Sequence, residues 1–378
     1  MSFCFRWLEQ ALLSSPKYRV TWKTFILPII GIMGFLIYIY LFNVDIQGII
    51  ANMQNIHADF YAMAAVAALL DVFFFTVAWH FLLKFLLVRV SLFREFLFVW
   101  VGIFVDTMIP AESVSGEITK IYLVNREQNG SAGKATASVV AQRLIGMSIN
   151  IVTLVIGAVL LLIENLLYGI VLALILFLIV MTVISLVLIM FLCRKEKWTL
   201  RIIDSLIRFA ERITRGHWKL LSLREEAMEA TKAFHGAIRD YGHAPKTVLL
   251  ASIAASTSWM FSLAVFYLTF LSIGYQQISW SAILVISSIF VAVKSIPIGI
   301  PFEIGLPEIT LTTLLVFFGV PWQVSATATI LMRLLTLWVR FFIGFGAQQW
   351  LGIKAMTASS NGNASSVEIE KRLNSAIA

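Results

Sequence analysis

The fold is decided by a stretch of sequence that occurs twice, IPAESVSGEIT at residues 109–119 and IPFEIGLPEIT at residues 300–310. A proline and two glutamates recur at one offset, since 301 − 110, 303 − 112 and 308 − 117 all equal 191. Each copy is followed by an arginine inside an apolar segment, Arg143 after the first and Arg333 after the second. The repeat indicates two halves of one architecture, in which charges inside apolar segments need a partner or a function.

The composition predicts a polytopic membrane protein. Hydrophobic residues make up 60% of the chain, charged residues only 13%, and the mean hydropathy is +0.88. Apolar runs long enough to cross ~30 Å of hydrocarbon recur along the sequence. The net charge of +8 comes from bases at the ends of these runs, as the positive-inside bias predicts, so nucleic acid is not an expected partner. Cys4 and Cys193 both fall on the predicted cytoplasmic side, and no disulfide, metal site or cofactor is expected.

The lengths of the apolar runs predict an all-α protein with six full spans and two re-entrant hairpins. Runs 96–109 and 281–296 are long enough only for a half-crossing, and each ends near a proline. Charged segments follow both, so we expect hairpins over about 96–126 and 281–318, where protein or a wet cavity surrounds the turn. The predicted full spans are 24–42, 60–83, 134–163, 166–192, 247–272 and 323–350.

Each half contains two spans, a hairpin and a further span. Three crossings separate the halves, so they are oppositely oriented, as in the inverted-topology repeats of many transporters. The amphipathic segment 194–246 is expected at the cytoplasmic surface, either as packed structural helices or with a regulatory or lipid-sensing role. The predicted parts are the first repeat 1–193, the amphipathic segment 194–246, the rest of the second repeat 247–353 and a disordered cytoplasmic tail 354–378.

The distribution of basic residues predicts the orientation. Residues 1–23 contain four Lys and Arg side chains, whereas loop 43–59 contains none, so both termini are expected in the cytoplasm. No short apolar core with a cleavage site follows residues 1–23, and span 24–42 is therefore expected to be retained. We expect an integral protein of the plasma membrane.

Glu117 and Glu308 are the first candidates for a functional site, each seven residues after a hairpin proline. One interpretation is a first-turn carboxylate that stabilises a helix N-terminus. The other is a carboxylate that faces a central cavity and takes up protons or contacts a substrate. Arg143 and Arg333 either form a structural ion pair with the glutamate of the same half or bind an anionic group such as a lipid phosphate.

Further residues of the hairpins join this set. Lys120 lies on the same helical face as Glu117, where it could pair with Glu117 or extend a basic lining, and its counterpart is Leu311. The substrate or proton site is also expected to include Glu112 and Glu303. Second-rank candidates for cavity lining or local pairing are Asp106, Lys294 and Arg340. Residues assigned to hairpin geometry, because they break helices or permit close approach, are Pro110, Gly116, Pro301 and Gly305.

Two groups of residues resemble the motifs of a known family, the lysylphosphatidylglycerol synthase transmembrane family, also called flippase-like. The first motif is similar to Pro110, Gly116-Glu117, Lys120, Tyr122-Leu123 and Arg143. The second is similar to Pro301, Gly305, Glu308, Gly319-Val320 and the run from Arg333 to Trp338. The resemblance covers about 20–350.

The resemblance implies a translocase that moves a polar-headed phospholipid or polyprenyl-linked lipid between leaflets, with proton coupling as one mode. Enzyme activity is not expected, because no stretch is long enough for the aminoacyl-transferase domain of the best-known members. Expected partners are the lipid substrate, the bilayer, an enzyme of lipid or glycan synthesis and further copies of the chain. A small-solute transporter, a membrane glycosyltransferase and a non-transporting partner of glycan enzymes stay open as alternatives.

Overall fold

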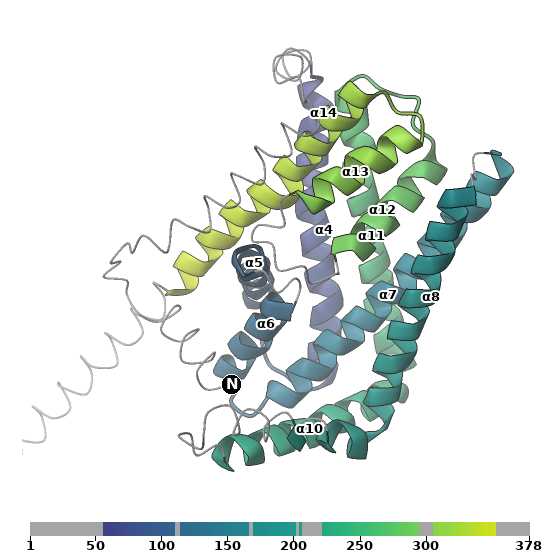
Figure 1. Ribbon diagram of the computed structural model, residues 1–378. Coiled ribbons are helices and arrows are strands. Elements are labelled where there is room, and N and C mark those ends of the chain that lie inside the picture. Colours follow the sequence, from purple (N-terminus) through teal and green to yellow (C-terminus); the bar gives the residue numbers. More distant parts are fainter. Residues whose placement is uncertain are drawn as a thin grey trace, which may run out of the picture.

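A computed structural model describes residues 56–109, 114–165, 169–201, 204–205, 221–294 and 305–352, and all regular secondary structure in these ranges is helical (Figure 1). Five helices are long and apolar enough to cross a membrane. They match five of the six predicted spans, and the remaining one, 24–42, lies outside the described residues. These five are α4 (Ala58–Phe85), α7 (Ala132–Ile163), α8 (Gly169–Arg194), α11 (Pro245–Ser272) and the helix Trp322–Gly352, which comprises α14 (Trp322–Arg333), the π-helical segment η2 (Leu334–Val339) and a further α-helical stretch.

Four shorter helices occupy the positions of the predicted hairpin limbs. At 1.5 Å per residue they are about 18–26 Å long, less than the ~30 Å of a bilayer core. Residues 110–113 and 295–304, which connect the limbs, lie outside the described part of the chain. The four are α5 (Leu92–Met108) and α6 (Val114–Glu127) in the first half, and α12 (Trp280–Lys294) and α13 (Leu306–Phe317) in the second.

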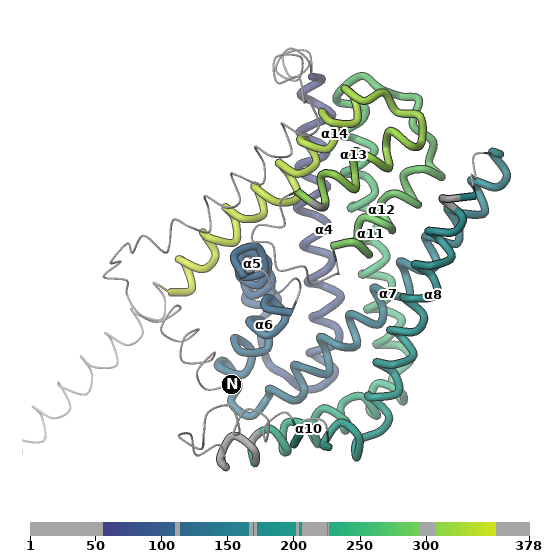
Figure 2. Tube along the Cα trace, viewed as in Figure 1, coloured from purple at the N-terminus to yellow at the C-terminus, as the bar shows by residue number. Residues whose placement is uncertain are grey.

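Helices α4 and α11 form the centre of the bundle and pack against each other along their length (Figure 2). They are antiparallel, because the backbone N–H of His57 before α4 donates to the carbonyl of Ser272 at the end of α11 (2.9 Å). Phe74 and Phe261 stack at 5.5 Å between ring centroids. Small side chains at the contact let the two backbones approach closely, as is usual between membrane helices.

Helix α10 (Leu221–Gly242) runs crosswise beneath the long helices (Figure 1). It lies within the predicted amphipathic segment 194–246. Its buried face is anchored by two hydrogen bonds, from Tyr241 Oη to the Leu82 carbonyl and from His235 Nδ1 to the Cys193 carbonyl, both 2.9 Å. These contacts tie α10 to the ends of α4 and α8 and make it part of the scaffold.

Candidate functional site

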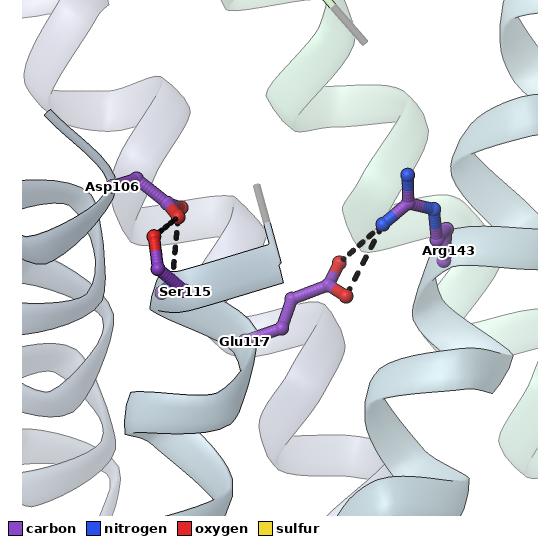
Figure 3. Close-up of polar contacts among 5 residues, drawn as sticks. Asp106, Ser115, Glu117 and Arg143 are labelled. Atoms are coloured by element: carbon purple, nitrogen blue, oxygen red, sulfur yellow. Dashed lines mark hydrogen bonds and ion pairs between the residues drawn. The ribbon is translucent and has the colours of Figure 1, made fainter. Parts of the chain in front are cut away.

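The first candidate site begins at the close crossing of α5 and α6. A Cβ atom added at Gly116 would lie 2.5 Å from the carbonyl oxygen of Gly102, so only glycine permits this approach. Asp106 Oδ1 accepts hydrogen bonds from the Ser115 hydroxyl and the Gly116 N–H, both 2.6 Å (Figure 3). Asp106, on α5, therefore satisfies one backbone N–H group at the start of α6, where a carboxylate is also favoured by the helix dipole.

Glu117 extends from the first turns of α6 toward Arg143 on α7 (Figure 3). Arg143 Nη1 donates to both carboxylate oxygens at 3.2 Å. The pair is partly accessible, because the side chain of Arg143 is 35% exposed and that of Glu117 27%. Arg143 therefore retains accessible surface while it holds Glu117.

The second pair has a different environment. Arg333 Nε donates to Glu308 Oε1 at 2.5 Å, and the two side chains are only 5% and 4% exposed. Glu308 Oε2 accepts the backbone N–H of Gly305, which begins α13 with φ +104°, at 2.7 Å. Glu308 therefore makes both contacts that the sequence suggested, one with the N-terminus of its helix and one with the arginine of its own half. Its side chain is buried.

Both arginines lie at the same place in their helices. Arg143 is 143 − 132 = 11 residues after the start of α7, and Arg333 is 333 − 322 = 11 residues after the start of α14. Eleven residues correspond to about 16 Å along each helix. A charged side chain within a membrane span is costly when it faces lipid, so the exposed surface of Arg143 is expected to face the protein interior or water.

Lys120 adds a buried cation beside the first pair. Its ammonium group lies over the rings of Phe75 and Trp79 on α4, 5.2 Å from each centroid. Such cation–π contacts compensate part of the loss of hydration. On the other hairpin, Lys294 Nζ lies 5.9 Å from the ring centroid of Phe290 on its own helix. Four of the predicted site residues lie outside the described part of the chain: Pro110, Glu112, Pro301 and Glu303.

Two further pairs of titratable side chains were not predicted. Asp71 on α4 binds Arg340 Nη2 at 2.6 Å and also accepts the hydroxyl of Ser258 on α11 at 2.6 Å. His80 on α4 binds Glu95 on α5 at 2.9 Å. The sequence contained a signal for both pairs, because Asp71 and His80 are, with Tyr61, the titratable residues of the apolar run 60–83.

Comparison with known proteins agrees with the motif resemblance. The family model of the lysylphosphatidylglycerol synthase TM region matches residues 25–344. A UPF0104 membrane protein of Pyrococcus horikoshii is 24% identical over 331 residues, which cover 85% of this chain and 95% of that protein. Since the family match spans most of the chain and the structure supplies membrane-spanning helices, this protein is an integral membrane protein that belongs to the lysylphosphatidylglycerol synthase TM region family.

Proposed function

We propose that this protein is a translocase, not an enzyme, that moves a polar-headed phospholipid or polyprenyl-linked lipid between the leaflets of the plasma membrane. Family membership suggests a function related to membrane lipids. The observation that carries the proposal is the partly exposed ion pair between Glu117 on α6 and Arg143, eleven residues into α7. A phosphate-bearing headgroup can replace Glu117 on the guanidinium of Arg143 through charge-assisted hydrogen bonds.

The proposed site is asymmetric. Arg143 is the group that exchanges partners, because it is accessible and binds Glu117 through one terminal nitrogen. The enclosed pair of Glu308 and Arg333 holds the start of α13 in place and has the role of scaffold. Lys120, whose ammonium group lies over Phe75 and Trp79, adds positive electrostatic potential near the pair of Glu117 and Arg143.

An inverted-topology repeat is the architecture that we propose for this function, with the division 1–193, 194–246, 247–353 and 354–378 and both termini cytoplasmic. Helices α4 and α11 have the same length, and their bounds differ by 187 residues, since 245 − 58 and 272 − 85 both equal 187. At that shift Asp71 corresponds to Ser258 and Phe74 to Phe261. Each of these residues contacts its own counterpart. A residue meets its counterpart only where a two-fold axis passes between them, which supports oppositely oriented halves.

The last span of each half supports the same arrangement. Gly157 on α7 packs against Val285 on α12, the first limb of the other half's helix pair. Gly344, in the last span of the second half, packs against Trp100 on α5, the first limb in the first half. Exchanged contacts of this kind are expected when two repeats interlock about an axis. In this arrangement we propose that α5–α6 and α12–α13 are re-entrant hairpins.

The test is movement of labelled lipids in proteoliposomes that contain the purified protein. Phospholipid and polyprenyl-phosphate analogues should change leaflet with the wild type and not with Glu117→Gln or Arg143→Ala. Glu127→Gln is the matched control, because Glu127 lies at the other end of α6 and pairs there with Arg94 of α5. A charge swap of Glu117 and Arg143 should restore folding without restoring transport. Transport by the swapped variant, or none by folded wild type, would contradict the proposal, and uptake of a small solute instead would favour a solute transporter.

A further inference from the structure

A second site lies between α4 and α5, away from the arginine pairs. Glu95 is completely buried, and its Oε2 lies 2.9 Å from His80 Nδ1. Its other carboxylate oxygen, Oε1, is buried and has no hydrogen-bond partner among the residues that the structure describes. The side chain of His80 is 23% exposed, so this imidazole connects a sealed carboxyl group to the surface.

We propose that His80 and Glu95 form a proton-binding site. With a neutral imidazole that donates from Nδ1, the pair carries one negative charge in an apolar environment, which is unfavourable. One proton taken from water by His80 Nε2, with transfer of the Nδ1 proton to Glu95 Oε2, makes the pair neutral. The imidazole ends neutral and the carboxyl group holds the added proton, so one proton is bound and the reverse steps release it.

Among the protonated forms of the pair, the nearby charges favour the one in which Glu95 holds the proton and the imidazole is neutral. Lys84 lies one turn after His80 on α4 and opposes a second positive charge on the imidazole. The other titratable groups nearby have their own partners. Arg94 pairs with Glu127 of α6, Lys134 of α7 donates to the Leu86 carbonyl at 3.1 Å, and Tyr241 of α10 donates to the Leu82 carbonyl. Burial holds the pKa of Tyr241 well above its ordinary value, so this phenol stays neutral.

The position of the pair suits exchange with the cytoplasm. His80 is five residues from the end of α4 and Glu95 three residues from the start of α5, about 8 Å and 5 Å along the helices. In the proposed orientation this end faces the cytoplasm. Glu117 and Glu308, which the sequence also offered for protons, are each engaged in an ion pair with an arginine.

The pair can couple protons to transport, a step that rests on the proposed function. Glu95 is carried by α5, the helix whose crossing with α6 positions Glu117. Displacing α5 relative to α4 would separate the Glu95 carboxyl group from His80, its hydrogen-bond partner in the described part of the chain. That separation is less costly when the carboxyl group is protonated and neutral. Proton binding should therefore facilitate the movement of the α5–α6 pair.

The proton site is tested without any lipid movement by infrared difference spectroscopy of the full protein in nanodiscs. Between about pH 5 and 8 the wild type should show a protonated carboxyl band that titrates. The band should be absent in Glu95→Gln and present in Glu127→Gln. In His80→Gln, the pH at which the band titrates should shift by about one unit or more. A wild-type spectrum with no titrating band, or the same band in Glu95→Gln, would overturn the site. If Glu95→Gln does not fold, the His80→Gln displacement decides.

Coupling is tested separately in proteoliposomes. An imposed pH gradient should accelerate lipid movement by wild type and by Glu127→Gln at least several-fold, and His80→Gln should lose this response. A titrating Glu95 with no response of wild-type transport to the gradient would overturn coupling alone. If wild type moves no lipid, the proposed function fails while the spectroscopic result still decides the proton site.

Discussion

The difference between the two glutamate–arginine pairs predicts very different costs for the same substitution. Glu308→Gln keeps the shape of the side chain and its ability to accept the Gly305 N–H, so the change removes mainly the charge. Arg333 would then be a buried cation, in a pair whose side chains are 4–5% exposed. Removing one partner of a buried ion pair costs about 3–5 kcal/mol of unfolding free energy.

Glu117→Gln is the corresponding change in the accessible pair. Water compensates much of the lost charge because Arg143 is 35% exposed, and such pairs contribute about 0–1 kcal/mol. We therefore expect Glu308→Gln to lose roughly 3 kcal/mol more stability than Glu117→Gln. For transport we expect the larger effect at the other pair: Glu117→Gln should fold but should not move lipid.

The free energy of unfolding should be measured by steric trapping of the purified protein in micelles. The control is the double variant Glu308→Gln with Arg333→Met, which also removes the buried positive charge and should recover most of the loss. Equal losses for the two single variants would refute the argument that burial distinguishes the pairs. A double variant no more stable than Glu308→Gln alone would refute the charge as the cause.

Two further predictions use the same unfolding measurement. Gly116→Ala should destabilise by about 1–3 kcal/mol, because the new methyl group overlaps the Gly102 carbonyl, whereas Gly146→Ala meets no atom within 4 Å and should not destabilise; equal effects would contradict the close crossing. Asp71→Asn should cost about 1.5–3 kcal/mol because Arg340 loses a charged partner, and exchanging the two residues should recover part of it; wild-type stability of Asp71→Asn would show that the pair is not stabilising.

Much of the secondary structure follows from the sequence alone. The prediction of short limbs over 96–109 and 281–296 agrees with α5 and α12, because a break after fewer than 20 apolar residues is a local signal. The five described long helices agree with their predicted spans for the same reason. The sixth span, the hairpin turns and the inverted orientation stay predictions.

The charged partners were harder to predict. Asp71 and Arg340 are 269 residues apart in sequence, and Asp71 has no place in the repeated element. The spacing within each half suggested that Glu117 pairs with Arg143 and Glu308 with Arg333. An interaction between the two halves leaves no local sequence pattern. Glu95 was overlooked because it stands near the start of α5, among residues typical of a helix end.

The sequence by itself determined that Glu117 and Glu308 begin short helices and that Arg143 and Arg333 lie in long apolar ones. Both halves carry the same glutamate at the start of a short helix and the same arginine eleven residues into a long one. Only the tertiary structure decided that Glu308 and Arg333 are enclosed while Glu117 and Arg143 stay accessible. Exposure depends on the side chains that other helices place over a pair, and those neighbours come from segments far away in the chain.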